Sequence, residues 1–153
     1  MKKLSELDLK RTYKTESSNL IKDFYIKALS ECVQYDRATF TFGSSILTTA
    51  AKGLDGLINN DGHMRLIIGR IPEKEDYDAL ESGAKMQEYQ DECLEKLRHL
   101  LSLARNSSLN SHRLDLLKYF IGSNRLEIKF AAARQKGIFH DKSGIIYGRD
   151  DEK

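Results

Sequence analysis

His140 and Lys142, in the stretch GIFHDKSGIIYG (137–148), are the pair of residues whose types and spacing best suit chemistry. If this stretch is an extended strand, residues two positions apart project from the same face, so the two side chains lie next to each other. An imidazole can attack a phosphorus atom and hold the phosphoryl group covalently, while an ammonium neutralises charge on the non-bridging oxygens. A second acid, such as another histidine across the phosphate, would protonate the leaving oxygen.

Basic residues are concentrated in the same part of the chain. Residues 125–149 carry six Lys or Arg against two acidic residues, whereas residues 73–92 carry eight acidic residues and two basic ones. An anionic substrate would therefore be drawn toward His140. Two solvated surfaces of opposite charge explain the same distribution, and a lone H-x-K tripeptide also occurs by chance. The basic residues that we take as candidate phosphate or DNA ligands are Lys129, Arg134 and Lys136.

Ser44 is a further candidate, because it stands where a strand gives way to a helix. The run RATFTFG (37–43) is β-branched and aromatic, which favours a strand, and Ser44 and Ser45 precede the helical pattern ILTTAAKGLDGLI (46–58). A helix N-terminus favours anions, so Ser44 can present its hydroxyl or backbone N–H to a phosphate. A simple helix N-cap is the interpretation that we favour.

The elements around these residues alternate in a way that predicts an α/β fold. A mixed or mostly parallel sheet flanked by helices is expected, because helices and strands follow one another along most of the chain. Besides the strand and helix around Ser44, the patterns predict a helix at 17–33, a turn at 59–62, a strand at 63–69, helix from Pro72 with a break near Gly83, a loop at 106–111, a helix at 112–124 and strands at 125–133 and 137–148.

Length and composition limit the classes of protein that need to be considered. The 153 residues suit one domain, and 40% hydrophobic with 31% charged residues is typical of a globular protein. No secretory signal or membrane span is encoded, so we expect a cytoplasmic protein. Cys32 and Cys93 form neither a disulfide framework nor a zinc spacing, and we expect no metal or cofactor. The other histidines, which lack partners at ligand spacing, are His63, His99 and His112.

Two segments of the chain resemble a known family. In the first, an early strand ends in Gly43-Ser44, a helix follows, and a second strand ends at Gly69. In the second, LEIKFAAARQKGIFHDKSGIIYG (126–148), a basic strand leads into H-x-K. Over about residues 17–149 the chain resembles the phospholipase D superfamily, in the branch of phospholipase D-like nuclease domains found with bacterial restriction enzymes and DEAD/DEAH-type helicases.

This resemblance implies a metal-independent phosphodiesterase that cleaves DNA through a phosphohistidine, with His140 as nucleophile and Lys142 as phosphate ligand. It also implies a homodimer in which two copies of His140 face each other across a two-fold axis, because family members with one motif per chain pair in this way. A helicase domain in the same full-length chain is a further expected partner. The domain would span residues 17–153, preceded by an extension of residues 1–16.

Two departures from the family pattern leave an alternative open. In H-x-K-x4-D the acidic residue would be position 147, but this chain has Tyr147. The family also continues into a strand with a Gly-Ser and an Asn near the phosphate, so we expect an N-terminal fragment whose fold is incomplete at its C-terminus. The alternative is a non-catalytic module that dimerises or binds nucleic acid. A lipid-cleaving enzyme is the weaker third hypothesis, because no amphipathic surface stretch predicts membrane contact.

Overall fold

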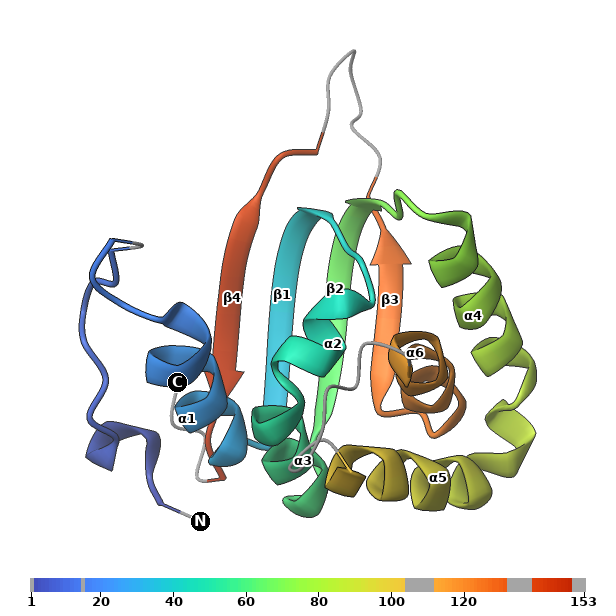
Figure 1. The fold of residues 1–153 in the computed structure, drawn as a ribbon, viewed down its shortest axis with the longest axis horizontal. Coiled ribbons are helices and arrows are strands. Elements are labelled where there is room, and N and C mark those ends of the chain that lie inside the picture. Colours follow the sequence, from blue (N-terminus) through green and yellow to red (C-terminus); the bar gives the residue numbers. More distant parts are fainter. Residues whose placement is uncertain (1, 15, 104–111, 132–138, 150–153) are drawn as a thin grey trace.

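The computed structural model describes residues 2–14, 16–103, 112–131 and 139–149, which form a four-stranded sheet and the helices that pack on it (Figure 1). The strands lie in the order β3-β2-β1-β4. The first three run parallel to one another, and β4 is antiparallel to β1. The predicted α/β fold with a mixed, mostly parallel sheet is therefore confirmed. The strands are β1 (Gln34–Thr41), β2 (His63–Arg70), β3 (Leu126–Phe130) and β4 (Lys142–Tyr147).

The helices pack on one face of this sheet (Figure 1). They are α1 (Ile26–Ser30), which continues a π-helical turn at Ile21–Tyr25, then α2 (Ser45–Thr49), α3 (Ala51–Asn59), α4 (Lys74–Lys85), α5 (Gln90–Leu103) and α6 (Arg113–Gly122). Short 3-10 turns lie at Leu4–Glu6 and at Gln87–Tyr89.

Alternation along β2 shows which face of the sheet is covered. Met64, Leu66 and Ile68 are buried and belong to the main hydrophobic core, while Ile67, between them, is 46% exposed. Successive strand residues point to opposite faces, so the core lies between the helices and one face only. In the described part of the chain no helix packs against the other face, which we call the open face.

The helix boundaries differ from the sequence-based predictions where packing decides them. The single helix predicted after Ser45 divides at Ala50 into α2 and α3. The break predicted near Gly83 falls at Met86 instead, between α4 and the turn before α5. Gly83 stays helical because α6 passes against it: a Cβ atom there would lie 2.5 Å from the carbonyl oxygen of Lys118. The glycine therefore serves close helix packing rather than a kink.

The first and last predicted strands also shift. The strand predicted at 37–43 begins earlier, at Gln34, and ends at Thr41. The strand predicted at 137–148 spans only Lys142–Tyr147 among the described residues. The helix predicted at 17–33 is regular α-helix only from Ile26 to Ser30. The predicted loop at 106–111 lies outside the described residues.

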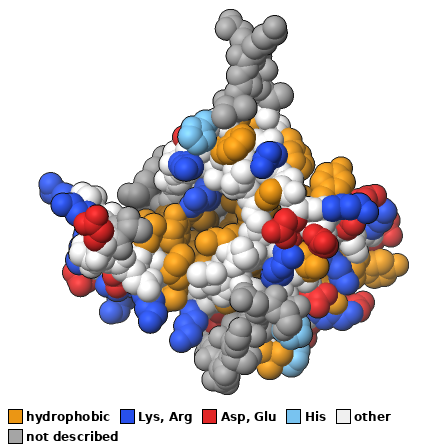
Figure 2. All heavy atoms as spheres, turned by 45° about the horizontal axis from the view of Figure 1, so that its top comes forward, with side chains coloured by type: hydrophobic (Ala, Val, Ile, Leu, Met, Phe, Trp, Pro, Cys, Tyr) orange, Lys and Arg blue, Asp and Glu red, His pale blue; other side chains and the backbone are white. Residues whose placement is uncertain are grey.

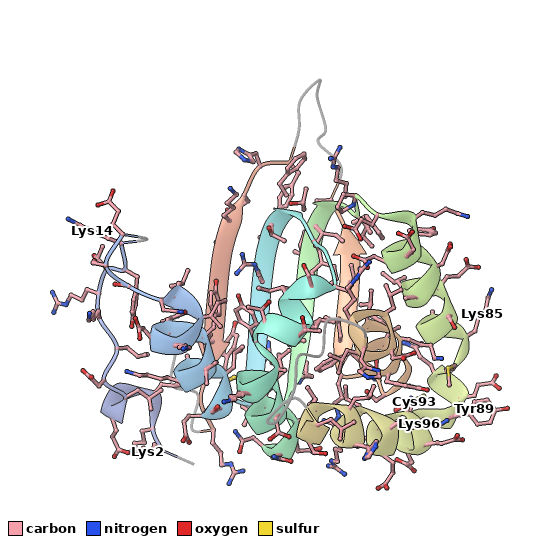
Figure 3. All side chains as sticks on the ribbon, viewed as in Figure 1. Lys2, Lys14, Lys85, Tyr89, Cys93 and Lys96 are labelled. Atoms are coloured by element: carbon pink, nitrogen blue, oxygen red, sulfur yellow. The ribbon has the colours of Figure 1, made fainter. Side chains whose placement is uncertain are left out.

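The described part of the N-terminal extension lies beside α1, and Lys2 and Lys14 mark its two ends in Figure 3. The backbone N–H of Lys2 donates to the carboxylate of Glu31 at 2.5 Å. The ring of Tyr13 packs on that of Phe24, with 5.6 Å between the ring centroids. The extension thus helps to form the surface next to α1. Within the described ranges, no helix combines the length and the apolar character needed to cross a membrane.

Candidate functional site

His140 lies at the carboxyl edge of the parallel strands. Because β4 runs antiparallel to β1, its first residue, Lys142, pairs with Thr39 near the end of β1, and His140 comes two residues earlier. The imidazole is exposed and meets the ring of Phe40 edge to face, with 5.7 Å between the centroids. His140 was predicted to sit within the strand, but the strand starts after it. Its orientation therefore depends on Phe40 as well as on strand geometry.

Lys142 faces the side of the sheet on which the helices pack. Its cross-strand partner Thr39 is buried on that side, and paired residues share a face. The lysine lines a cleft of about 810 Å³ between the N-terminal segment, α1, β1 and β4. We call it the α1 cleft; Phe24, Tyr25 and Arg37 line it together with Lys142.

Arg37 is a functional candidate that the sequence analysis missed. It lies in the middle of β1, half-buried, and its register partner on β4 is Gly144. Its Nη1 donates hydrogen bonds to the hydroxyls of Tyr25 at 2.6 Å and Tyr35 at 2.9 Å. Burial, the largest cause, raises the pKa of Tyr35 to about 12, so this hydroxyl is protonated at neutral pH. The sequence signal was weak: Arg37 is the first residue of the β-branched and aromatic run at 37–43 and has the same strand parity as buried Thr39.

A second basic side chain joins the edge from β2. The guanidinium carbon of Arg70 lies 5.7 Å from the centroid of the Phe40 ring, and the ring of His140 meets the same phenyl ring. Phe40 thus supports both an imidazole and a cation at the end of neighbouring strands. Figure 2, which turns this edge forward, shows Lys and Arg side chains gathered around a hollow lined by hydrophobic side chains. Ligands of α/β sheets bind outside the carboxyl ends of the strands, which is where these groups lie.

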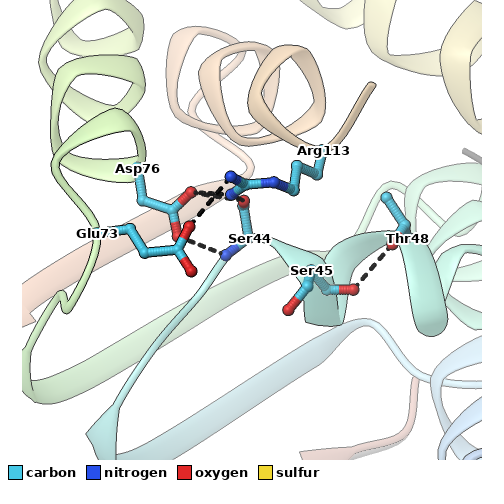
Figure 4. A network of polar contacts seen from close by, with 6 residues as sticks. All are labelled: Ser44, Ser45, Thr48, Glu73, Asp76 and Arg113. Carbon is cyan, nitrogen blue, oxygen red and sulfur yellow. Dashed lines mark hydrogen bonds and ion pairs between the residues drawn. The ribbon is translucent and has the colours of Figure 1, made fainter. Parts of the chain in front are cut away.

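Ser44 has a different role from the one considered from the sequence. It is fully buried, its N–H donates to Asp76 Oδ2 at 2.8 Å, and its hydroxyl donates to Asp76 Oδ1 at 2.6 Å (Figure 4). Its side chain makes no capping bond to α2. A phosphate would have to displace a buried carboxylate to reach it, so Ser44 is neither an available phosphate ligand nor a simple side-chain cap.

Arg113 completes this buried network. Its Nη1 donates to Asp76 Oδ1 at 2.6 Å and to Ser44 Oγ at 2.7 Å, and its Nη2 lies 3.0 Å from Glu73 Oε2 (Figure 4). The four side chains come from the β1–α2 turn, the start of α4 and the start of α6. The network therefore holds in place the turn that follows β1, close to the end of the strand that carries Arg37.

The remaining basic candidates do not join His140 and Lys142 in the described structure. Lys129 pairs in register with Ile67 on the open face and forms an ion pair with Glu127 at 2.9 Å. The open face is opposite the one that Lys142 occupies. The other two candidates, Arg134 and Lys136, lie outside the described residues.

Tyr147, which stands where the motif has an acid, interacts with Asp36. Hydrogen bonding from Arg65 is the largest cause that holds the pKa of Asp36 below its ordinary value, and hydrogen bonds from Gln34 and Tyr147 act in the same direction. Asp36 Oδ1 accepts from Arg65 Nε at 2.8 Å. Position 147 thus contributes a phenol hydroxyl to a polar cluster rather than a carboxylate.

We compared the chain with models of protein families, with curated proteins and with solved structures. None of them matches it. The resemblance to phospholipase D-like nucleases therefore stays a prediction, and the functional proposal rests on the geometry of the site. Among the described residues, no group of three His, Cys, Asp or Glu side chains is arranged to hold a metal ion.

The arrangement offers a nucleophile and cations rather than a metal-binding centre. An exposed imidazole lies at the carboxyl edge against Phe40, which points to the open face, while Lys142 and Arg37 line the α1 cleft on the side of the sheet that the helices cover. These are the groups needed to bind an anion and to attack it. A carboxylate acting as general acid or base is not among them, so a second proton donor would have to be supplied from elsewhere.

Proposed function

We propose that this chain is a phospholipase D-like phosphodiesterase domain that cleaves DNA without a metal ion. The observation that carries the proposal is the position of His140 and Lys142: they lie two residues apart at the carboxyl edge of a mostly parallel sheet, and Lys142 lines a cleft that contains a second cation, Arg37, and, among the described residues, no carboxylate. A phosphodiester is the anion that such a nucleophile and such cations can process together.

The proposed reaction has two steps. A ring nitrogen of His140 attacks phosphorus, so that an N–P bond forms while the P–O bond to the leaving nucleoside breaks and that oxygen takes a proton. Water then attacks the phosphohistidine, the N–P bond breaks, and a phosphate monoester leaves. Lys142 neutralises the non-bridging oxygens in both steps. The proton for the first step would come from the partner's His140 in a two-fold dimer, which the exposure of this histidine permits.

A non-catalytic nucleic-acid-binding or dimerisation module is the second candidate. Tyr147 favours it, because the hydroxyl at this position hydrogen-bonds Asp36 and supplies no acid to the reaction. The two candidates share the same surface and differ in whether His140 does chemistry.

Cleavage of plasmid and single-stranded DNA in excess EDTA separates them. We expect cleavage that survives EDTA and falls by roughly a thousandfold or more in His140→Ala. His99→Ala, which removes an exposed histidine from α5, is the matched control and should cleave like the parent. DNA that stays intact while it still binds the chain would reject the enzyme in favour of the module.

A further inference from the structure

Arg37 carries a charge that its described neighbours do not balance. Its Nη1 donates to the hydroxyls of Tyr25 and Tyr35, and its guanidinium carbon lies 5.8 Å from the centroid of the Tyr25 ring. Within the described part of the chain no carboxylate forms an ion pair with it. By contrast, Arg113 faces Asp76. Taking a charge out of water is costly unless it is paired, so a half-buried guanidinium among neutral groups favours an anion brought by a ligand.

The guanidinium also keeps hydrogen-bond donors for such an anion. Arginine has five N–H donors, and only those on Nη1 bond to described residues of the chain. The Nε and Nη2 edge is the one that binds both oxygens of a phosphate in parallel. The phenol of Tyr35 does not compensate the charge, because burial keeps it protonated.

The residues that line the α1 cleft suit a ligand that is partly anionic and partly apolar. Its volume of about 810 Å³ falls in the range of small-molecule sites. Arg37 and Lys142 line the strand side, while Phe24 and Tyr25 bring aromatic rings from the helix side. The two rings pack edge to face with 5.2 Å between centroids. A flat, unpaired base can stack on such rings, whereas a base inside a duplex cannot reach them.

We propose that the α1 cleft binds one nucleotide of a single-stranded nucleic acid, with its phosphate on Arg37 and Lys142 and its base against Phe24 and Tyr25. The inference rests on the proposed function for the identity of the ligand, and it places Arg37 as a binding residue of the same site. It also predicts that the chain prefers single-stranded to double-stranded nucleic acid, since the cleft takes an unpaired nucleotide.

Binding of a short fluorescein-labelled oligothymidylate, followed by fluorescence anisotropy, tests this proposal. We expect Arg37→Gln to weaken binding by roughly tenfold to a hundredfold, because a charge-assisted contact is lost. The slope of log affinity against log salt should shrink by about 0.7, the value for one phosphate contact on a single strand. An unlabelled duplex of the same sequence should compete poorly.

Two further variants keep the test decisive. Arg65→Gln removes the same charge from the neighbouring strand β2, where the side chain is ion-paired with Asp36 on the open face, and it should bind like the parent. Arg37→Lys keeps the charge without the parallel donors and should bind with intermediate affinity. Equal losses in Arg65→Gln and Arg37→Gln, or equal competition by duplex and single strand, would overturn the assignment to the cleft.

The result of the binding test and the result of the cleavage assay can be distinguished from each other. His140→Ala should abolish cleavage and still bind the oligonucleotide. Binding that depends on Arg37 without any cleavage by the parent chain would reject the enzyme and retain the site. Cleavage that requires His140 but does not respond to Arg37→Gln, at unchanged oligonucleotide affinity, would retain the enzyme and reject the site.

Discussion

Single residues in this molecule differ in how far their chemistry follows from the sequence. The H-x-K spacing predicted a pair at one face of a strand, and Lys142 does begin β4, but His140 precedes the strand and rests against Phe40. Contacts of that kind join residues about a hundred positions apart, and no local pattern encodes them. Arg37 was missed for the same reason, since its tyrosine partners come partly from another element.

The Cys32 thiol should be unreactive in the native protein. Burial, the largest cause, raises its pKa to about 12, so almost no thiolate is present at neutral pH. In a Cys93→Ser variant we expect an aromatic disulfide reagent to label Cys32 only at the rate at which the protein unfolds. Labelling within seconds in the absence of denaturant would show that the site opens locally.

Tyr35 should make stability depend on pH in the alkaline range. Its pKa is about 12 in the folded protein, mainly because of burial, against an ordinary value of 10.0. The unfolded chain therefore loses this proton first, and the free energy of unfolding should fall as pH rises from 10 toward 12. Urea unfolding at several pH values measures this fall. Tyr35→Phe should make it shallower; the same slope in both proteins would mean that another group causes the fall.

Helices and strands were predicted well in kind and order, because hydrophobic periodicity decides them. Their ends were predicted less well. Gly83 illustrates the reason: a glycine inside a helical pattern suggests a break, yet in this fold it admits α6 against α4. The role of Ser44 was missed similarly, because Asp76 is thirty-two positions away and no local signal joins the two residues.

The network around Asp76 should contribute strongly to stability at the level of these elements. Asp76 is fully buried and accepts from Ser44 and Arg113, so Asp76→Asn would leave a guanidinium without its buried partner. We expect a loss of about 3 kcal/mol in the free energy of unfolding, measured with urea.

Asp78→Asn is the matched control for this prediction. Asp78 lies on the same helix, α4, and forms an exposed ion pair with Lys74 at 3.8 Å. Exposed pairs of this type contribute about 0.5 kcal/mol or less, so the control should unfold almost like the parent. Similar losses in the two variants would mean that the network adds no more than a surface ion pair does.

For the whole molecule, the sequence predicted the class of fold but not the arrangement within the sheet. Neither the central place of β1 and β2 nor the antiparallel β4 follows from local patterns, because strand order depends on contacts between distant segments. The open face was not foreseen either. Its exposed Ile67 gives β2 the alternation of a half-buried strand, and Ile145 of β4 is exposed on the same face, which short apolar runs do not reveal when they are taken one at a time.

The pairing of β4 with β1 also has a consequence for how the chain folds. About a hundred residues separate Thr39 from its partner Lys142, whereas β1 and β2 are close along the chain. Closing so long a loop costs entropy before any contact is gained, and on the ribosome β4 is synthesised after the other three strands. We therefore expect β4 to dock last and its amide hydrogens to exchange faster than those of β2. His140 and Lys142 would then take up their positions only once the rest of the core has formed.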